Sequence, residues 1–594
     1  MQKKRHTYQT GIIGNCGFIA HVHKDGSIPW LCWPKFDSSP VFGTMLDPDA
    51  GEFSIIPEEE ILSTSQQYIQ NTNILVTEFH TAAGKFRIID FAPRFYSEET
   101  AQYPLVLCRK VELLEGNPRI RVNLSPKYDY GKEKPTVTNG LNFLSYKFHS
   151  LELKLYTNFS HNYLLNGKSE VLNETKYFYL ACDSDLSHNL KETMESFYHR
   201  TKGYWQNWVK HCSLGNFAQN EVIRSALCLK IHQYQDTGAI IASSTTSLPE
   251  SPGSGRNWDY RYCWIRDSYY TLNALTTLGH FEEMERFANY LANLKPNQEG
   301  RYQPLYTITG DSFIDEEILD LEGYKQNVPV RVGNQAYTHI QNDVYGQILL
   351  SLLPLYSDER ILDKNRFQNL SQIRNILFQI KKTMNEPDAG LWEFRNLSQK
   401  HCYTFLFHWA GASAVIKIAE SLGEKDLLKE AITLKEEAIK KIEECYHKEK
   451  SCYTQAEGTA HLDASLLQLV TMSYLDPTSP KAKDHIKAIE KNLKTEKGLL
   501  YRYKHKDDFG TPESTFLVCS FWYIECLACM NRLEEAEQLF HTTVNYSNHL
   551  GLFSEDIEAE SNSMWGNFPQ TYSHVGLVNA AYRISQKKGN PVFL

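Results

Sequence analysis

The sequence predicts two domains, an antiparallel β-sandwich followed by a domain built from helices. Three observations predict this. The 594 residues are enough for two to four domains. The first third of the chain alternates apolar and polar residues with period two, and after about residue 190 the apolar residues recur with helical spacing. A run of strands followed by a run of helices is typical of separate domains.

Three segments of the first third predict half-buried strands. Apolar and polar residues alternate in 85–93 (KFRIIDFAP), 119–124 (RIRVNL) and 151–156 (LELKLY). Turn residues separate the segments, as in EGNP from Glu115 and TNG from Thr138. Several such strands at short spacing predict an antiparallel sandwich.

Helical spacing begins with residues 190–212, which form an amphipathic, aromatic segment. In residues 281–294 one face collects Met284, Phe287, Ala288 and Leu291. In residues 426–446 one stripe collects Leu427, Ala431, Leu434 and Ala438. The loops between such helices, not the helices themselves, carry unusual mixtures of aromatic and charged residues.

Composition limits the classes of function and the cell compartment. The net charge of −9 argues against nucleic acid or an anionic membrane as the main partner. No stretch approaches the roughly 18 apolar residues of a membrane span, and the basic N-terminus lacks the apolar run of a signal peptide. The 13 cysteines are odd in number and follow no framework spacing. We therefore expect a cytoplasmic protein with free thiols.

Two short motifs look like metal sites, but their surroundings favour structural roles. Cys526 and Cys529 form a C-x-x-C inside an apolar helical pattern that has no second pair, so we expect buried helix thiols. His21 and His23 have no third ligand nearby in the sequence. We expect neither a metal nor another cofactor.

The stretch RNWDYRYCWIRD, residues 256–267, crowds aromatic rings around fixed charges. An unpaired buried charge is costly, and large rings prefer burial, so this mixture suits neither an apolar core nor a plain surface. A site for a polar, ring-shaped ligand needs both kinds of side chain. Sugar recognition is one such task, because flat rings stack on C–H faces while charged groups bind hydroxyls.

Two loops carry carboxylates that could act on a sugar. Glu393 in DAGLWEFRN follows Leu391 and Trp392, and desolvation beside such an apolar face would keep its proton near neutral pH, as a general acid requires. Glu555 opens a second polar loop. Paired carboxylates around an aromatic pocket suit hydrolysis of a glycosidic bond. From the local sequence alone, the favoured alternative is a surface glutamate beside a packed tryptophan for Glu393 and a loop charge for Glu555.

A third loop, residues 321–349, brings Arg331, Asn334, Gln341 and Asp343 near an aromatic helical segment. Its glycines allow a tight turn. Arg331 could bind a hydroxyl of a ligand or form a salt bridge within the loop, and the sequence leaves both alternatives open.

The ordered set of motifs resembles glycoside hydrolase family 15, the glucoamylase family, in its short bacterial form. The matching stretches are TGAIIASSTTSLPE, GRNWDYRYCWIRDSYYTLNAL, GYKQNVPVRVGNQAYTHIQNDVYG, GLWEFR, GLLYRY, ESTFLVCSFW and GNFPQTYSHVGLVNAA. Together with the opening IGNCGFIAHVHKDGSIPW they extend the resemblance over nearly the whole chain. It implies a multidomain fold: an N-terminal β-sandwich in 1–188, a helical linker in 189–215 and an (α/α)6 barrel in 216–594.

The resemblance also implies an exo-acting, inverting glucosidase that removes glucose from the non-reducing ends of maltooligosaccharides or glycogen. On that pattern Glu393 is the general acid and Glu555 the general base. The residues that would form the subsite for the terminal glucose are Tyr260, Trp264, Arg266, Asp267 and Arg502, with the backbone of Leu391 and Trp392.

Two departures from the family pattern affect the prediction. Asp556 stands where fungal relatives have Gln, and an extra carboxylate facing the pocket would raise the pKa of Glu555. Residues 401–408 differ from relatives that carry Ser-Lys there, and we expect them to line the outer subsites.

Other functions stay open. Trehalase and an α-1,6-glucosidase acting on isomaltose or dextran fragments are the alternatives within the family, and the sequence does not reveal the subsite for the leaving sugar. A phosphorylase is less consistent, because it would need only one carboxylate. A non-catalytic glycan-binding regulator is the remote alternative, and the presence of both carboxylates argues against it. The sequence does not indicate an oligomeric state.

Overall fold

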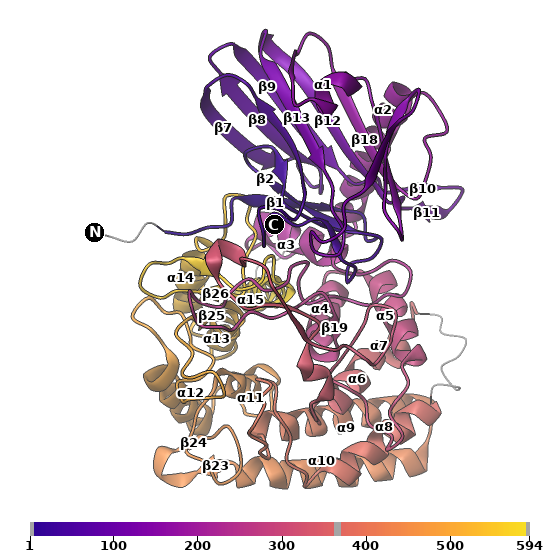
Figure 1. Cartoon of the computed structure of the whole chain (residues 1–594). Helices are drawn as coiled ribbons and strands as arrows, with labels where there is room; N and C mark the ends of the chain where they lie inside the picture. Colours follow the sequence, from indigo (N-terminus) through magenta and orange to yellow (C-terminus); the bar gives the residue numbers. More distant parts are fainter. Residues whose placement is uncertain (1–4, 362–369, 590–594) are drawn as a thin grey trace.

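The computed structural model describes residues 5–361 and 370–589 and shows a strand-rich domain packed on a helical one (Figure 1). Strands β1 (Thr10–Gly14) to β18 (Lys176–Cys182) build the first domain. Helices α3 (Gln219–Ile231) to α15 (Thr571–Lys588) dominate the second. The predicted order of an antiparallel β domain followed by a helical domain is confirmed.

The first domain is a sandwich of antiparallel sheets. One layer is an eight-stranded sheet in the order β14-β15-β16-β18-β12-β9-β8-β7. Its further strands are β7 (Ile61–Tyr68), β8 (Leu75–Thr81), β9 (Gly84–Phe91), β12 (Val106–Gly116), β14 (Thr136–Asn139), β15 (Phe143–Lys147) and β16 (Glu152–Thr157). The facing layer consists of two four-stranded sheets, β1-β2-β4-β5 and β17-β13-β6-β3. They use β2 (Ile19–His23), β3 (Ser27–Ile28), β4 (Trp30–Cys32), β5 (Pro40–Phe42), β6 (Glu52–Pro57), β13 (Arg119–Ser125) and β17 (Ser169–Val171).

Side-chain alternation explains why these strands pair as two layers. In β13 the side chains of Ile120, Val122 and Leu124 are buried, while Arg119 and Arg121 point to solvent. Phe53 of β6 meets Phe178 of β18 between the layers, with ring centroids 6.1 Å apart. The strands predicted at 85–93, 119–124 and 151–156 are confirmed as β9, β13 and β16.

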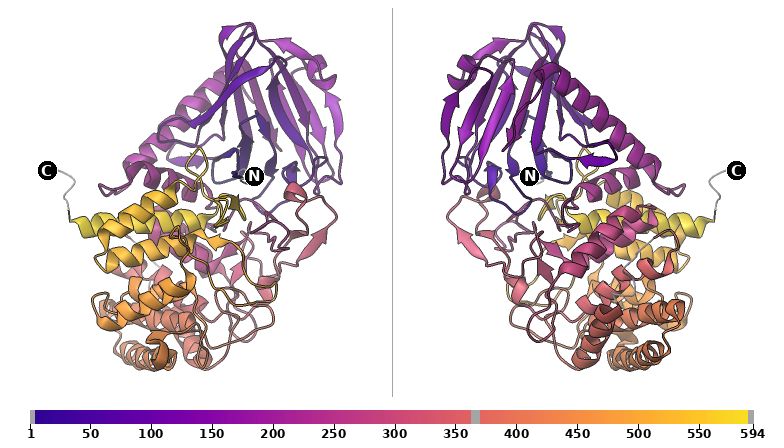
Figure 2. Two further views of the ribbon diagram at one scale, coloured as in Figure 1. Left: turned by 90° about the vertical axis from the view of Figure 1, so that its left-hand side faces the viewer. Right: turned by 90° about the vertical axis from the view of Figure 1, so that its right-hand side faces the viewer.

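One helix, α2 (Leu190–Lys210), covers the outer face of the eight-stranded sheet and reaches the helical domain (Figure 2). Near its start, Met194 packs in a cluster with Tyr179 of β18. Near its end, the Trp208 ring stacks on His280 at 3.9 Å, and its Nε1 donates to Glu283. This helix therefore contacts both domains.

The helical domain alternates inner and outer helices around one axis. The inner helices are α4 (Ile265–Thr277), α6 (Val344–Leu352), α9 (Cys402–Leu422), η4 with α11 (Ala464–Leu467 and Gln468–Thr471), α13 (Leu517–Cys529) and α15. The outer helices are α3, α5 (Phe281–Asn293), α8 (Leu370–Thr383), α10 (Lys425–Glu444), α12 (Pro480–Leu493) and α14 (Leu533–Val544). Because α15 packs against α4, the inner ring closes as an (α/α)6 barrel.

Sequence pattern decides which helix is inner. Helix α9 is apolar on nearly every side and is buried. Helix α10 has one buried apolar stripe, and its other faces carry solvent-exposed lysines and glutamates. The predicted helices at 281–294 and 426–446 are confirmed as α5 and α10, and their predicted apolar faces are buried.

Short elements complete the chain. They include α1 (His161–Leu165), α7 (Pro354–Ser357), β10 (Phe95–Ser97), β11 (Thr100–Gln102), β19 (Cys263–Trp264), β20 (Leu305–Tyr306), β21 (Glu317–Leu319), β22 (Val330–Val332), β23 (Tyr446–His447), β24 (Cys452–Tyr453), η1 (Tyr324–Gln326), η2 (Gln335–Thr338) and η3 (Lys448–Lys450). Within the described residues, no helix has the length and apolar character needed to cross a membrane. All 13 cysteines are free, and the predicted buried helix thiols Cys526 and Cys529 lie in α13.

Candidate active site

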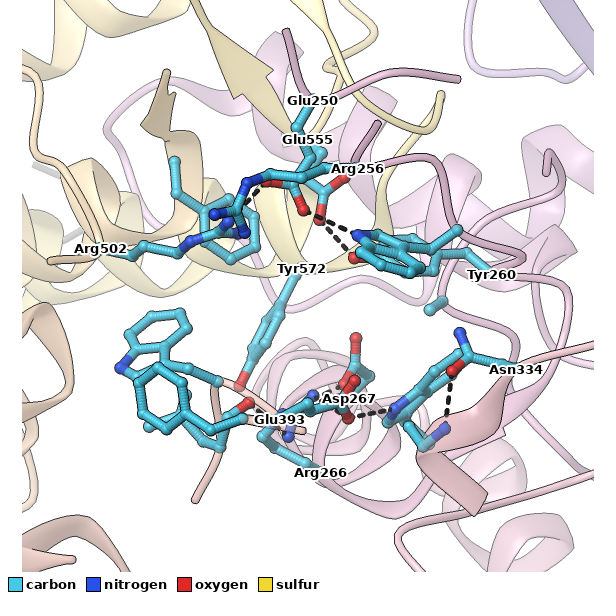
Figure 3. A pocket seen from close by; sticks show the side chains of 18 of the residues that line it. Glu250, Arg256, Tyr260, Arg266, Asp267, Asn334, Glu393, Arg502, Glu555 and Tyr572 are labelled. Atoms are coloured by element: carbon cyan, nitrogen blue, oxygen red, sulfur yellow. Dashed lines mark hydrogen bonds and ion pairs between the residues drawn. The ribbon is translucent and has the colours of Figure 1, made fainter. Parts of the chain in front are cut away.

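A pocket opens at the end of the barrel where the inner helices begin (Figure 3). The loops that precede α4, α9, α13 and α15 line it, together with the loop before η2. The two predicted catalytic glutamates and all the residues predicted for the subsite of the terminal glucose lie around this pocket. Segments far apart in the sequence therefore meet at one place.

The side chains of the stretch 256–267 face two different environments, the pocket and the buried interior. Trp258 and Tyr260 line the pocket. Between and after them, Asp259 and Arg261 are fully buried and form an ion pair at 2.6 Å. Arg261 also donates to the hydroxyl of Tyr130 in the β domain. The aromatic residues thus face the ligand space, while these two charges pair with each other and tie the loop to the neighbouring domain.

The closed end of the pocket holds buried polar atoms that have no hydrogen-bond partner among the described residues. Asp267, in the first turn of α4, is buried, and within the described residues its Oδ2 accepts no hydrogen bond. The Nε of Arg266 lies 3.4 Å from that oxygen and donates no hydrogen bond there. Burial raises the pKa of Asp267 to about 6, although Arg266 opposes the rise. Buried polar atoms of this kind require partners, and the hydroxyls of a sugar would supply them.

Tyr572, near the start of α15, points toward the same end of the pocket (Figure 3). Its hydroxyl is buried and has no hydrogen-bond partner among the described residues. Sequence reasoning did not single out Tyr572, although its motif GNFPQTYSHVGL was quoted for the family resemblance. It adds a further hydroxyl to the polar set beside Arg266 and Asp267.

Glu393 stands on one wall and is surrounded by donors. Its Oε1 accepts from Trp264 Nε1 at 2.7 Å, Gln341 Nε2 at 3.2 Å and Arg266 Nη2 at 3.5 Å. Its side chain keeps 22% of its exposure. The sequence predicted an apolar face beside Glu393 but did not predict these three donors. Trp392 lines the pocket too, but its Nε1 donates to Asp463.

The turn that presents Glu393 is strained. Gly390 and Glu393 have φ of +66° and +62°, in the left-handed region that disfavours a side chain. A Cβ at position 390 would lie 2.6 Å from the His401 ring, so glycine is required there. Strain at a non-glycine residue of a candidate site is typical of functional positions.

Glu555 stands on the opposite wall and is buried (Figure 3). It precedes β26 (Asp556–Ile557) in a small sheet with β25 (Thr515–Phe516) and β27 (Met564–Trp565). The Tyr260 hydroxyl donates to its Oε1 at 2.6 Å, and within the described residues its Oε2 has no partner. Burial raises the pKa of Glu555 to about 8, and the nearby Glu250 carboxylate adds to the rise.

Asp556 does not line the pocket. Its Oδ1 accepts from the Ser514 hydroxyl at 3.0 Å. A Cβ at Gly566 would lie 2.7 Å from Glu555 Oε2 and 3.0 Å from Asp556 Oδ2, so the two carboxyls share one side of that glycine. Burial raises the pKa of Asp556 well above its ordinary value, and Glu555 adds to that rise.

A third carboxylate, Glu250, lies beside Glu555 (Figure 3). Its two oxygens accept from Trp258 Nε1 at 3.0 Å and Arg502 Nη2 at 2.6 Å. Sequence reasoning missed this residue, although it ends the quoted motif TSLPE. Its chemistry depends on contacts with loops that a local pattern does not reveal.

Two of the sequence-based expectations fail. Arg331 does not line the pocket: its Nη1 donates to the carbonyls of Gly255 and Asn257, and its Nε lies 3.3 Å from Glu316. It supports Trp258 from behind, with Cζ 4.5 Å from the ring centroid, so the loop salt bridge is the correct alternative. Residues 401–408 do not line the pocket either, because His401 is buried directly before α9 and residues 402–408 lie in its first turns inside the core.

The β domain braces the wall that holds Glu555. The Tyr8 hydroxyl donates to the carbonyl of Gly566 at 2.8 Å, and the His6 ring stacks on Trp565 at 4.4 Å. Trp565 belongs to β27, whose partner β26 begins directly after Glu555. An N-terminal segment therefore reaches the candidate site through the third strand of this small sheet.

This geometry suits a reaction that needs an acid and a base on opposite sides of one bond. Each carboxylate is oriented by an aromatic donor from the stretch 256–267, and the polar closed end suits hydroxyls of a sugar. Within the described residues, no group of three His, Cys, Asp or Glu side chains is arranged to hold a metal ion.

The sequence matches known families over both domains. Residues 216–582 match the model for glycosyl hydrolases family 15, and residues 4–145 match the model described as trehalase-like, N-terminal. The first match spans more than half of the chain. The chain belongs to glycosyl hydrolases family 15 and is a glycosidase.

Similar proteins match along nearly their whole length. A trehalase of Thermoplasma volcanium is 32% identical over 590 residues, which cover 97% of this chain and 93% of the relative. A trehalase of Mycobacterium tuberculosis is 31% identical over 599 residues, which cover 94% and 86%. A solved bacterial glucoamylase in complex with acarbose has a TM-score of 0.70 at 16% identity, covering 98% of this chain and 95% of its own. That last likeness concerns the fold.

Proposed function

We propose that the protein hydrolyses α,α-trehalose to two glucose molecules, with inversion at the attacked carbon. The observation that carries the choice of substrate is the match of relatives named trehalases over nearly full length, at about 30% identity. This favours the trehalase alternative over the glucoamylase that the sequence resemblance put first. The opposed carboxylates of the pocket support the reaction type.

One glucose unit would occupy the closed end of the pocket. Its hydroxyls would bind the Asp267 Oδ2, the Arg266 Nε and the Tyr572 hydroxyl, which have no hydrogen-bond partner among the described residues. Tyr260 and Trp264 would contact its ring faces, and Arg502 would lie on the side of Glu250. If the buried Arg266 and Asp267 end the pocket beyond this sugar, it would select a chain end or a disaccharide.

Glu393 would then donate a proton to the bridging oxygen, and the bond from that oxygen to the anomeric carbon breaks. Glu555 would take a proton from a water that attacks the same carbon from the opposite face. One water is consumed and two glucose molecules form. The attacked unit leaves as β-glucose, whereas the leaving unit keeps its α configuration.

Proton NMR of the purified protein with fresh trehalose tests this proposal. We expect α- and β-glucose to appear in equal amounts in the first minutes, before mutarotation. Parallel samples with maltotriose and isomaltose test the two alternatives. Faster hydrolysis of maltotriose would restore the glucoamylase function, and α-glucose alone from trehalose would overturn inversion.

A further inference from the structure

The pocket mouth contains a loop, residues 504–511, that follows Tyr503 and that we call the mouth loop. Three of its side chains, Asp507, Asp508 and Phe509, line the pocket. They belong to none of the residues that sequence reasoning assigned. The mouth loop lies against the turn that presents Glu393, more than 100 positions earlier in the chain.

Asp508 binds the backbone of that turn with both carboxylate oxygens. Its Oδ2 accepts from the Arg395 amide at 2.6 Å, and its Oδ1 accepts from the Asn396 amide at 3.2 Å. These are the second and third amides after Glu393. A carboxylate that accepts from two consecutive amides forms charge-assisted bonds with a defined direction.

The turn needs such support because Glu393 has a φ of +62°. A non-glycine residue in the left-handed region reverts to a relaxed backbone unless its neighbours hold it. On the chain side before Glu393, Asp388 accepts from the Gly390 amide at 3.0 Å. On the side after Glu393, Asp508 makes the corresponding contact. The backbone of the Glu393 turn is thus held on both sides, by Asp388 before Glu393 and by Asp508 after it.

The mouth loop is itself anchored, so it can act as a support. Asp507 forms an ion pair with Arg256 at 2.5 Å, with side-chain exposures of 4% and 6%. Phe509 packs edge-on against Trp258, with centroids 5.0 Å apart. Trp258 donates to Glu250, next to Glu555. The mouth loop therefore connects the wall of Glu555 to the turn of Glu393.

We propose that Asp508 is a positioning residue for Glu393: it sets the backbone of the acid turn and so aims the carboxyl at the bridging oxygen. The proposal rests on the proposed function, because it takes Glu393 as the proton donor. A misplacement of a reacting group by about 1 Å can cost up to roughly 100-fold in rate. The loss should fall on substrates whose leaving group needs a proton.

Two substrates separate positioning from general damage. When trehalose is cleaved, the leaving glucose unit departs as an alkoxide unless the bridging oxygen is protonated, whereas α-glucosyl fluoride releases fluoride without help from an acid. For Asp508→Ala we expect kcat/KM on trehalose to fall about 10- to 100-fold, with the rate on α-glucosyl fluoride nearly unchanged. Asp508→Asn should lose less, because its amide oxygen can still accept one of the two bonds.

Asp476→Ala is the matched control. Asp476 also accepts a backbone amide and a hydroxyl in a loop, both from Thr478, and it does not line the pocket. Its substitution should leave both rates unchanged. Equal losses on both substrates in the two Asp508 variants, or no loss at all, would overturn the positioning role.

The outcome is separable from the fate of the proposed function. If the wild-type protein does not cleave trehalose, the substrate proposal fails. The loss of kcat/KM is then measured on whichever of maltose or isomaltose the protein cleaves and is compared with the loss on α-glucosyl fluoride. A loss in Asp508→Ala that is confined to the disaccharide still supports the positioning role. If thermal melting shows that Asp508→Ala is unstable, the same comparison of the two substrates in Asp508→Asn decides whether Asp508 positions Glu393.

Discussion

The two walls of the pocket carry the same kind of carboxyl in opposite surroundings. Glu393 keeps part of its exposure and accepts from three nitrogen donors on one oxygen. Glu555 is buried, accepts from one phenol hydroxyl and has Glu250 beside it. The wall of Glu393 is built by barrel loops, whereas the wall of Glu555 is also braced by Tyr8 of the β domain.

On the proposed mechanism, these different environments suit two side chains of the same kind to different roles. Burial and a like charge raise the pKa of Glu555, which makes it a stronger base once it has lost its proton. Its Oε2 has no hydrogen-bond partner among the described residues, so a lone pair would be available for the proton of an attacking water. Glu393 instead sits in a strained turn that fixes its direction, as a proton donor to one oxygen requires.

The largest expected effect comes from removing each carboxyl in turn. Glu393→Gln should lower kcat/KM on trehalose roughly 1,000-fold and spare α-glucosyl fluoride, because fluoride needs no proton. Glu555→Gln should lower kcat/KM on both substrates by roughly the same factor, because both reactions need an activated water. Steady-state kinetics on the two substrates measures the contrast. The opposite pattern would exchange the two roles, and equal losses in both variants would remove the distinction between the walls.

The aromatic residues that donate to the two carboxyls allow a second comparison of the two walls. Tyr260→Phe removes the hydroxyl that donates to Glu555, and Trp264→Phe removes the Nε1 that donates to Glu393. A bond to a charged group contributes about 1.5–3 kcal/mol, so each variant should lose about 10- to 100-fold. We expect Tyr260→Phe to lower kcat/KM on both substrates, and Trp264→Phe to lower kcat/KM on trehalose more than on α-glucosyl fluoride. Identical ratios in the two variants would contradict separate roles for these donors.

Glu250→Gln tests the charge on the wall of Glu555. If Glu555 is the base, activity should rise on the acidic side as Glu555 loses its proton, and burial raises the pKa of Glu555 to about 8. A like charge raises a carboxyl pKa, so its removal lowers that pKa and moves the acidic limb of the kcat/KM profile to lower pH, by about one unit. The pH profile on trehalose measures the shift, whatever the absolute rate. An unmoved limb would show that Glu250 does not act on Glu555 by charge.

The smallest expected effect concerns the brace from the β domain. Tyr8→Phe removes the donor to the Gly566 carbonyl and leaves a buried acceptor unpaired, at a cost of about 1–3 kcal/mol. We expect a lower melting temperature and a loss of a few fold on both substrates, because the brace supports the wall of Glu555. Tyr163→Phe, at an exposed tyrosine of the β domain, is the control and should change neither quantity. A loss confined to trehalose would link the brace to Glu393 instead.

Much of the fold followed from local patterns. Alternation in 119–124 and helical spacing in 281–294 each identified an element and its buried face, because both depend on neighbours within a few residues. The family motifs placed the candidate site in loops that the structure brings together, apart from Arg331. No local pattern separated Arg331 from the lining residues, since an arginine in a loop can bind a ligand or a neighbouring carboxylate equally well.

The surroundings of the two carboxyls were decided by tertiary structure. Sequence alone put Glu393 beside an apolar ring, yet its donor Trp264 lies 129 positions away, and the donor of Glu555 lies 295 positions away. Glu250 and Asp508 act through contacts of the same long range. Periodicity reports which face of an element is buried, whereas hydrogen bonds and charge depend on which loops meet. That meeting is set by closure of the barrel and by the β domain packed on it.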